Sequence, residues 1–337
     1  MCKISIIIPC YNVDFKLLHR CLTSIDLQTF SDYEVIIVDD GSASSYSETF
    51  HKLGNEYKNV SVFHQENKGV SAARNFGMER SQGEYIMFVD ADDYLVPVFL
   101  EEALTIAETY NADMVMGMNM TTYTTDSVQL KITDSKKIRV FVGGDIKSIN
   151  KWMLGRVQHQ TDGSYLGQGP WNRLVSRQLA VNTPFNETLP IGEDIVWNLQ
   201  LLLKAKKVCI ANNVWYIYYM NPCSSSRKYR ENAIQESYDS LMEIKKYLDF
   251  EDDEQYLSYC FRCWGDLKRI YRCYLSHNKD NLQQKRYLFN TDPWHELASK
   301  RFKRLCNYKY RFMRGLYKSH LLFDYYRVKA MMTVERE

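Results

Sequence analysis

Hydrophobic residues in the first 95 positions follow two alternating patterns. Short runs of β-branched and other apolar residues predict strands, and apolar residues spaced three or four positions apart predict amphipathic helices. The strand pattern occupies residues 4–8, 33–38, 60–64 and 85–89, and the helical pattern occupies residues 17–25 and 69–81. We expect Pro9 to end the first strand and Gly83 to end the second helix as a left-handed cap. This alternation predicts an α/β fold with a mostly parallel, Rossmann-like central sheet flanked by helices.

The predicted strands are apolar on both faces, as in a sheet buried between two helical layers. Ligands of such sheets bind beyond the carboxyl ends of the strands. Polar residues gather at that edge here. They follow the first strand (Tyr11, Asn12), the second (Asp39, Asp40) and the fourth (Asp90, Asp92).

The patterns are less regular beyond residue 95. We expect a helix at 97–110, a strand at 114–118, hairpins in the Thr-rich segment 121–142, a helix at 194–204, and mostly helices from residue 228 onward. This predicts one large α/β domain at residues 1–220 and a helical C-terminal region at residues 221–337.

Charge differs between these two regions. Apolar residues make up 45% of the 337 residues and charged residues 25%, the ordinary balance of a folded globular protein. Residues 1–220 carry 20 Lys and Arg against 25 Asp and Glu, whereas residues 221–337 carry 23 against 16. The acidic region suits a bound cation, and the basic region suits an anionic partner.

Signals for export and membrane insertion are not evident in the chain. It begins without a signal-peptide pattern and contains no run of 18 apolar residues, so any membrane contact is expected to be peripheral. Nine scattered cysteines favour a reducing cytoplasm over a disulfide scaffold. Cys260, Cys263, Cys273 and His277 are candidate zinc ligands, but the helical pattern around them favours buried thiols.

Asp90 and Asp92 leave a predicted strand with one residue between them. Two such carboxylates can share one hard cation, Mg²⁺ or Mn²⁺, with the phosphates of a substrate. The alternative is a solvated acidic turn in which Asp93 caps the next helix. Lys68 and Arg74 accompany the start of a helix, where phosphates are favoured, although Arg74 also suits a surface ion pair.

Further candidates surround this pair. Tyr11 can stack on a nucleotide base and Asp40 can accept its N–H, although Asp-Asp-Gly-Ser is also an ordinary turn. Glu193 and Asp194 precede an apolar helix, so that one of them either caps it or serves as the general base that deprotonates an acceptor hydroxyl. Trp171, in GQGPWNRL, either stacks on a sugar or belongs to the core.

The motifs IIIPCYN, VDDGS, NKGVSAARNFG, FVDADDYL and GED occur in an order and spacing that resemble family 2 glycosyltransferases with the GT-A fold, over roughly residues 3–220. The resemblance implies a nucleotide-binding half at residues 1–95 and an acceptor half at residues 96–220. It implies that Asp90 faces the ribose, that Asp92 holds the metal on the diphosphate, and that Asp194 rather than Glu193 is the catalytic base. The donor contacts that it implies or that the pattern favours are Pro9, Tyr11, Asn12, Asp40, Lys68, Arg74, Asp90 and Asp92.

This resemblance also implies inversion at the sugar carbon, a UDP-hexose or UDP-N-acetylhexosamine donor, and a role in bacterial surface-polysaccharide assembly. Because a QxxRW motif does not follow GED and no spanning helix is expected, transfer of a single sugar is favoured over processive synthesis. The alternative is a non-catalytic sugar-nucleotide-binding or scaffold protein on the same fold.

Two other enzyme classes fit the sequence less well. A dinucleotide-dependent dehydrogenase needs G-x-G-x-x-G in its first turn, where this chain has Pro-Cys-Tyr-Asn. A phosphohydrolase of the aspartate-nucleophile type carries its motif after the first strand of the core, whereas Asp90 follows the fourth.

The C-terminal region contains a basic segment with interspersed apolar residues. Between residues 299 and 331 there are ten Lys and Arg and a single acidic residue, Asp324. Apolar residues recur there at roughly helical spacing: Phe302, Leu305, Phe312, Leu316 and Leu321. An amphipathic basic helix of this kind favours an anionic membrane surface and a lipid-linked acceptor, and the alternative is that its apolar stripe packs as core. Nucleic acid is not expected, because the acidic first part would repel it.

Overall fold

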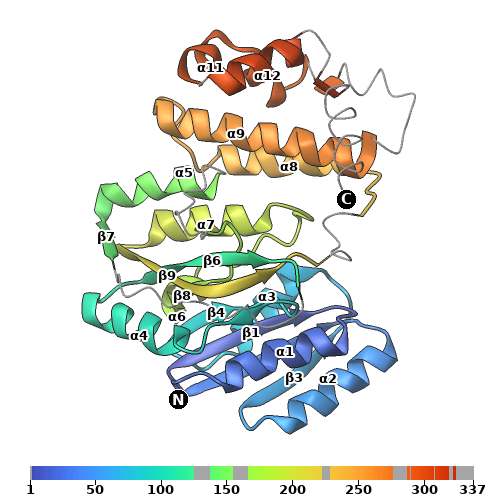
Figure 1. Ribbon diagram of the computed structural model, residues 1–337, viewed down its shortest axis with the longest axis vertical. Coiled ribbons are helices and arrows are strands. Elements are labelled where there is room, and N and C mark those ends of the chain that lie inside the picture. Colours follow the sequence, from blue (N-terminus) through green and yellow to red (C-terminus); the bar gives the residue numbers. More distant parts are fainter. Residues whose placement is uncertain are drawn as a thin grey trace. The chain divides into compact units, whose positions relative to one another are not determined.

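The computed structural model describes residues 2–124, 137–154, 166–221, 228–275, 287–288, 290–306, 308–318 and 322–323. The chain divides into two compact units, the first comprising residues 1–153 and 157–222 and the second residues 154–156 and 223–337 (Figure 1).

The first unit is built on a mixed sheet in the order β3-β2-β1-β4-β8-β6-β9-β5, with β7 paired to β9. Its strands are β1 Ile4–Cys10, β2 Tyr33–Asp40, β3 Val60–Gln65, β4 Tyr85–Phe88, β5 Tyr94–Leu95, β6 Met114–Thr122, β7 Ile138–Val142, β8 Arg173–Ser176 and β9 Lys207–Tyr219. The first four pair in parallel, as do β6 and β9, whereas β8, β5 and β7 pair antiparallel to their neighbours. The predicted α/β fold with a mostly parallel sheet is therefore confirmed.

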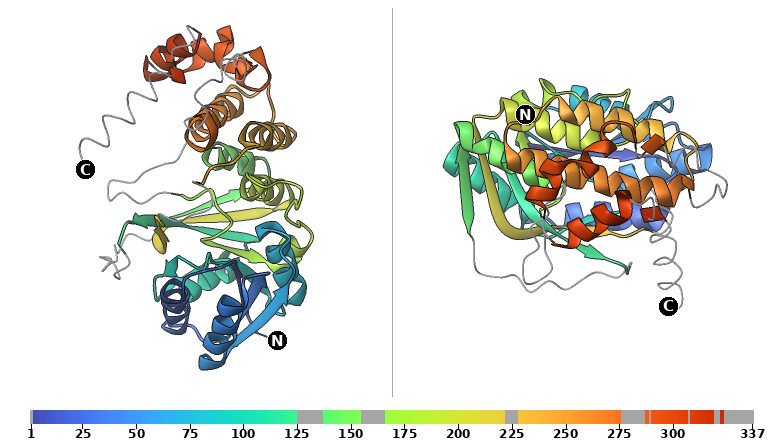
Figure 2. Two further views of the ribbon diagram at one scale, coloured as in Figure 1. Left: turned by 90° about the vertical axis from the view of Figure 1, so that its right-hand side faces the viewer. Right: turned by 90° about the horizontal axis from the view of Figure 1, so that it is seen from above.

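Helices cover both faces of this sheet (Figures 1 and 2). They are α1 Phe15–Asp26, α2 Ser44–Glu56, α3 Val70–Arg80, α4 Phe99–Tyr110, α5 Asn150–Met153, α6 Arg177–Val181 and α7 Glu193–Lys204, with the 3-10 helix η1 at Gly143–Ile149. Ile4, Ile6 and Ile8 of β1 share one core with the buried residues of α1, α2 and α4. Ile7 faces the other layer, where a Cβ on Gly77 of α3 would lie 2.4 Å from its Cγ2. Only glycine permits this close approach of helix and strand.

Two predicted boundaries are wrong. Strand β1 does not end at Pro9 but continues to Cys10, because beyond its last pair with β4, Ile7–Phe88, it still pairs with β2. Helix α3 ends at Arg80 and its C-cap residue is Ser81 in an extended conformation, so Gly83 is not the cap. Gly83 instead lies against β1, where a Cβ would be 2.6 Å from the Ser5 nitrogen. Close packing, rather than a left-handed turn, thus accounts for this glycine.

The second unit is mostly helical, as predicted. It contains α8 Ala233–Lys245, α9 Asp253–Ile270, the π-helix η3 Tyr271–Leu275, the 3-10 helix η4 Trp294–Ala298, α11 Lys300–Leu305 and α12 Tyr308–Lys318. Cys260 and Cys263 of α9 and Cys273 of η3 are buried free thiols. Burial raises the pKa of Cys260 to about 12, as expected of a buried neutral thiol. The fourth zinc candidate, His277, lies outside the described residues.

The basic segment of this unit does not form the single amphipathic helix that its spacing predicts. Phe302 on α11 is fully buried, whereas Phe312 on α12 is 56% exposed, and Leu321 lies outside the described residues. Tyr317 is buried instead, and its hydroxyl donates to the Leu288 and Trp294 carbonyls at 3.0 and 2.9 Å. A break after Leu305 separates the two helices and turns their apolar residues to different surroundings.

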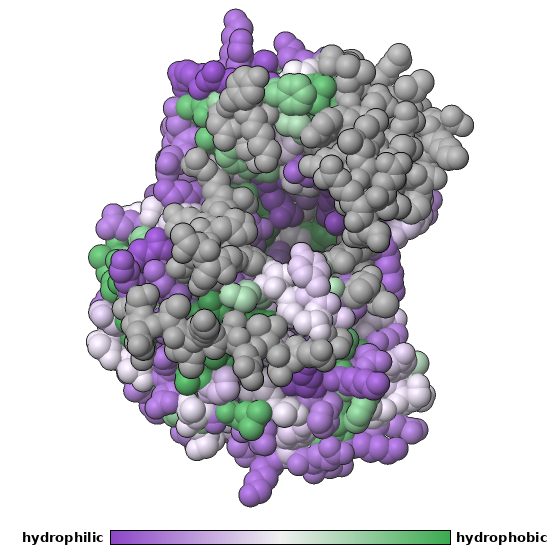
Figure 3. Space-filling model, viewed as in Figure 1, coloured by the Kyte–Doolittle hydropathy of each residue, from purple (hydrophilic) through white to green (hydrophobic). Residues whose placement is uncertain are grey.

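Among the described residues drawn in colour in Figure 3, hydrophilic residues predominate and hydrophobic ones form small separate patches. Within the described part of the chain, no helix is long and apolar enough to cross a membrane.

Candidate active site

The loops after β1 and β2 are joined by hydrogen bonds. Asn12 has a left-handed backbone with φ 48°. Its N–H donates to Ser42 Oγ at 2.9 Å, and its Oδ1 accepts the Ala43 N–H at 2.9 Å. Pro9 lies half-buried in β1, and Tyr11 between them is 55% exposed. Asn12 therefore fixes a loop that presents the Tyr11 ring to solvent.

Asp40 at the end of β2 organises the start of α3. It is only 4% exposed. Its carboxylate accepts the Gln65 side-chain amide at 2.7 Å and the main-chain N–H groups of Lys68 and Gly69, both at 2.9 Å. Gly69 has φ 92°, which favours glycine there. The main chain of Lys68 is thus held beside the N-terminus of α3, and its side chain is exposed.

Asp39 beside it is fully buried and stabilises the same loop. Burial by itself raises the pKa of Asp39. Hydrogen bonds from Ser42, Ser47 and His64 outweigh that effect and hold the pKa below its ordinary value. The carboxylate stays ionised and keeps the loop in place.

Arg74 on α3 connects the two acidic parts of the site. Its Nη2 donates to Asp90 Oδ1 at 3.3 Å and its Nη1 to Glu193 Oε1 at 3.2 Å. The guanidinium lies over the Phe185 ring, 5.2 Å from the centroid, and the residue is 4% exposed. Burial lowers the pKa of Arg74, but Asp90, Glu193 and Asp194 outweigh this and raise it. The surface ion pair considered for Arg74 is therefore wrong, because the guanidinium is buried and its two carboxylate partners are only partly exposed.

Asp90 and Asp92 lie in the turn that follows β4. The Asp90 N–H donates to the Tyr216 hydroxyl at 3.1 Å, and Asp92 Oδ2 accepts from the Asn221 amide at 2.9 Å. Burial and the Asp92 charge raise the pKa of Asp90, against the lowering effect of Arg74. Such carboxylates, whose charges oppose one another, fit a divalent cation that would neutralise them.

Asp93 has a role that its position in the sequence did not indicate. It does not cap α4, whose N-cap is Val98 without a side-chain bond. Instead it is fully buried, and it accepts the Tyr216 hydroxyl at 2.6 Å and the Tyr219 N–H at 2.7 Å. Burial, Asp90 and Asp92 raise its pKa well above the ordinary value. Asp93 ties the turn to β9, a long-range contact without a local sequence signal.

Helix α7 brings two carboxylates to the site in its first turn. Its N-cap is Gly192 with φ 76°, so neither Glu193 nor Asp194 is the cap residue. Burial first, and the Asp194 charge next, raise the pKa of Glu193 to about 6, although Arg74 lowers it. Asp194 Oδ1 accepts the Ile195 N–H at 2.7 Å. Glu193 is thus the partner of Arg74, and Asp194 is its neighbour on the same turn.

Trp171 belongs to the core, so the alternative in which it stacks on a sugar is wrong. It is 8% exposed and stacks on Tyr216 and Tyr218, with ring centroids 4.7 and 5.6 Å apart. Arg173, the fully buried first residue of β8, donates to the Gly167 and Trp171 carbonyls, both at 2.8 Å. Burial lowers the pKa of Arg173 to about 9. Nothing in the sequence pattern had singled out this buried arginine.

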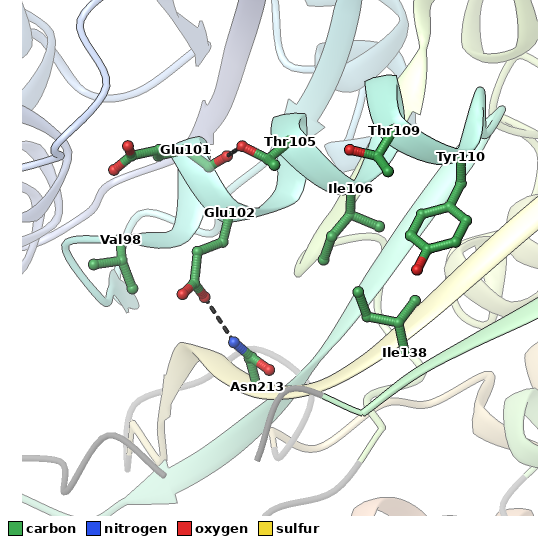
Figure 4. Close-up of a pocket in the computed structure, with 9 residues that line it drawn as sticks. All are labelled: Val98, Glu101, Glu102, Thr105, Ile106, Thr109, Tyr110, Ile138 and Asn213. Atoms are coloured by element: carbon green, nitrogen blue, oxygen red, sulfur yellow. Dashed lines mark hydrogen bonds between the residues drawn. The ribbon is translucent and has the colours of Figure 1, made fainter. Parts of the chain in front are cut away.

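Two other features of the described residues lie apart from these side chains. A pocket of 390 Å³ between α4 and β9 contains none of the predicted donor residues (Figure 4). Glu102 at its wall accepts the Asn213 amide at 2.7 Å. In the second unit, Asp292, His295 and Glu296 lie close enough to share an ion, but Asp292 and His295 are exposed, and exposed groups of this kind are common without a metal.

Comparison with solved structures identifies the fold. The S. aureus TarS 1-349 structure in complex with UDP-GlcNAc is similar to this chain with a TM-score of 0.64 at 19% identity, covering 99% of this chain and 92% of TarS 1-349. The likeness identifies the fold as GT-A.

Sequence relatives identify the family. Residues 5–161 match glycosyl transferase family 2. An uncharacterized glycosyltransferase of Haemophilus influenzae is 36% identical over 63% of this chain and 92% of its own length. The cholesterol galactosyltransferase of Borreliella burgdorferi is 30% identical over 66% of this chain and 62% of its own length. The chain belongs to glycosyl transferase family 2 and spans less than two thirds of the length of several such relatives.

Proposed function

We propose that this protein is an inverting, metal-dependent glycosyltransferase that moves a single sugar from a UDP-hexose or UDP-N-acetylhexosamine to an acceptor hydroxyl. The observation that carries the proposal is the pair of ion pairs by which the buried guanidinium of Arg74 joins Asp90 to Glu193. It joins the turn that suits a metal and diphosphate to the helix turn that suits a base. Such a site needs both a charge-neutralised leaving group and a base.

Donor binding follows from the strand ends. Pro9 and the exposed Tyr11 ring frame the nucleotide base, and Asp40 fixes the loop from which Lys68 reaches the phosphates. Asp90 faces the ribose. Asp92 and Asp90 would hold Mn²⁺ or Mg²⁺, which supplies positive charge to the diphosphate as it leaves.

Asp194 is the proposed base. It takes the proton of the acceptor hydroxyl while that oxygen forms a bond to the anomeric carbon and the bond to the UDP oxygen breaks. Attack opposite the leaving group inverts the configuration. Glu193 is less suited to this task because its carboxylate is paired with Arg74 at 3.2 Å.

Names of similar proteins support the donor and the setting. TarS 1-349 has been solved with UDP-GlcNAc at 19% identity, and a Bacillus spizizenii poly(ribitol-phosphate) beta-glucosyltransferase is 30% identical over 64% of this chain. They support our proposal that the protein acts in bacterial surface-polysaccharide assembly, and we propose that it does so in the cytoplasm. Single-sugar transfer is favoured because QxxRW does not follow GED in the sequence.

A peripheral contact with the inner face of the cell membrane is part of the proposal. Lys300, Lys303 and Lys318 are exposed on α11 and α12, and exposed Phe312 accompanies them. Cations near an anionic surface each add about 1 kcal/mol, and an exposed aromatic ring adds apolar contact. A lipid-linked acceptor would lie at such a surface.

The test is a panel of nucleoside diphosphate sugars incubated with Mn²⁺, with and without acceptors, and scored for released nucleotide. Slow hydrolysis of one UDP-sugar without acceptor, faster with a glycan acceptor, is expected. Donor binding without hydrolysis or transfer would favour the scaffold alternative. A product of unchanged anomeric configuration would contradict the inverting mechanism.

A further inference from the structure

Arg20 on α1 is hydrogen-bonded to the main chain of Asp92, although the two residues are 72 positions apart in the sequence. Its Nη2 donates to the Asp92 carbonyl at 2.6 Å. The same guanidinium lies over the ring of Tyr94, 4.7 Å from the centroid, and over the ring of Tyr219, 4.9 Å from the centroid. Two aromatic faces restrict where the guanidinium can lie, so the hydrogen bond to Asp92 has a fixed direction.

Asn221, just after β9, holds the side chain of the same aspartate. Its amide donates to Asp92 Oδ2 at 2.9 Å. The end of β9 is itself tied to the turn, because Asp93 accepts both the Tyr216 hydroxyl and the Tyr219 N–H. Among the described residues no hydrogen bond is donated to Asp92 Oδ1. The contacts therefore hold Asp92 from two sides and leave one oxygen for a ligand.

We infer that Arg20 and Asn221 are positioning residues that orient Asp92 toward the divalent cation of the nucleotide site. This inference rests on the proposed function, because it requires a metal at Asp90 and Asp92. Outer residues that orient a metal ligand by hydrogen bonds typically contribute about 10- to 100-fold to metal affinity or activity.

The direction in which metal affinity changes when Arg20 is replaced distinguishes a positioning role from a purely electrostatic one. Arg20 is positive, and a positive charge near a cation site opposes binding of the cation. If charge were its main influence, replacing Arg20 by a neutral residue would tighten metal binding. If Arg20 orients Asp92, the same replacement weakens metal binding.

The experiment measures Mn²⁺ affinity through the EPR signal of the free ion, with UDP present, and UDP affinity separately in chelator. Arg20→Met is expected to weaken Mn²⁺ binding about 10-fold or more, with UDP affinity in chelator unchanged. Arg20→Lys keeps the charge and a hydrogen-bond donor, so its Mn²⁺ affinity should lie between those of the wild type and Arg20→Met. Lys16→Met on the exposed face of the same helix is the matched control and should bind Mn²⁺ normally.

Asn221→Ala tests the second contact and covers the case in which Arg20→Met does not fold. It should also weaken Mn²⁺ binding, and the Arg20→Lys and Asn221→Ala double variant should lose less than the sum of the two losses. Contacts that act through one shared residue are not additive.

Three results would overturn the inference. The first is unchanged or tighter Mn²⁺ binding by folded Arg20→Met or Arg20→Lys. The second is an equal loss of UDP affinity in chelator, which would make Arg20 a nucleotide contact. The third is a wild-type protein that binds UDP but no Mn²⁺, which would refute the metal role in the proposed function as well. Normal Mn²⁺ binding by both the wild type and the Arg20 variants refutes the inference alone.

Discussion

Arg74 is the residue on which both chemical parts of the site depend. Its guanidinium is buried and paired at once with Asp90 and Glu193. Removing either carboxylate leaves a buried charge with fewer partners, which is costly. Variants of Arg74 would therefore change stability and activity together. Variants of Asp92, Asp194 and Glu193 distinguish an effect on activity from an effect on stability better.

Asp92→Asn is expected to lose most transfer activity while the protein stays folded. The amide removes the negative charge that a divalent cation requires, but it keeps the size of the side chain. Activity with Mn²⁺ and thermal unfolding, measured on the same preparation, check this. Full activity of the wild type in excess chelator would refute the metal role.

Asp194→Asn is expected to reduce turnover by at least about 10²-fold with donor binding nearly unchanged, as for loss of a general base. Glu193→Gln is the comparison. It should weaken the link to Arg74 without removing the base, so its loss should be smaller. A larger loss in Glu193→Gln would move the base to Glu193.

The activity is expected to fall as pH drops through about 6, where Glu193 takes up a proton and its charge no longer pairs with Arg74. This pKa is raised above its ordinary 4.5, so the folded protein binds the proton more tightly than the unfolded chain. The group therefore increases the free energy of unfolding as pH falls from about 6 to 4.5. As pH falls below about 6, turnover should therefore decrease while the free energy of unfolding increases, and measuring both against pH checks this. If Glu193→Gln still loses turnover near pH 6, Glu193 is not the group that titrates there.

Strand β9 acts at the scale of elements, because it carries the residues that fix the turn after β4. Tyr216 and Tyr219 meet Asp93 there, and Asn221 just beyond the strand meets Asp92. The turn and the strand are more than 120 residues apart in sequence. Their contact makes the turn after β4 dependent on β9 of the same unit.

Asp93→Ala should therefore lower the free energy of unfolding by about 3 kcal/mol, since it leaves a buried hydroxyl and a buried N–H without an acceptor. Tyr216→Phe removes the bond to Asp93 and also the acceptor of the Asp90 N–H, so it should cost a comparable amount. Urea unfolding at neutral pH measures both. An Asp93→Ala protein as stable as the wild type would show that this contact is not structural.

At the scale of the whole molecule, the excess of positive charge lies in the helical unit. Removing the chain from residue 299 is a poor test of membrane binding, because Phe302 and Tyr317 are buried within that unit. Exposed lysines can be changed without disturbing them. These are Lys300, Lys303 and Lys318.

The protein is expected to co-sediment with anionic vesicles and not with neutral ones, and changing these three lysines to Gln should reduce binding on the order of 100-fold. About 1 kcal/mol per cation supports that estimate. Replacing Lys16, Lys52 and Lys58 of the first unit by Gln is the matched control. Negligible binding of the folded wild type to both vesicle types would refute the membrane contact.

The sequence by itself determined the βα order, the apolar strands and the edge where polar residues gather. These follow from local periodicity, because strand and helix spacing are read within a few residues. Motifs that resemble a known family also predicted roles for four carboxylates: metal binding for Asp90 and Asp92, and the general base for Asp194 or Glu193.

Only the tertiary structure decided what these residues contact. The decisive contacts join residues far apart in the chain. Arg74 pairs with Glu193, Asp93 accepts from Tyr216 of β9, Arg20 donates to the Asp92 carbonyl, and Trp171 stacks on Tyr216. Local spacing carries no signal for such contacts. Burial and pairing, which set the pKa of Glu193 and distinguish a core ring from a ligand contact, arise only when distant segments pack.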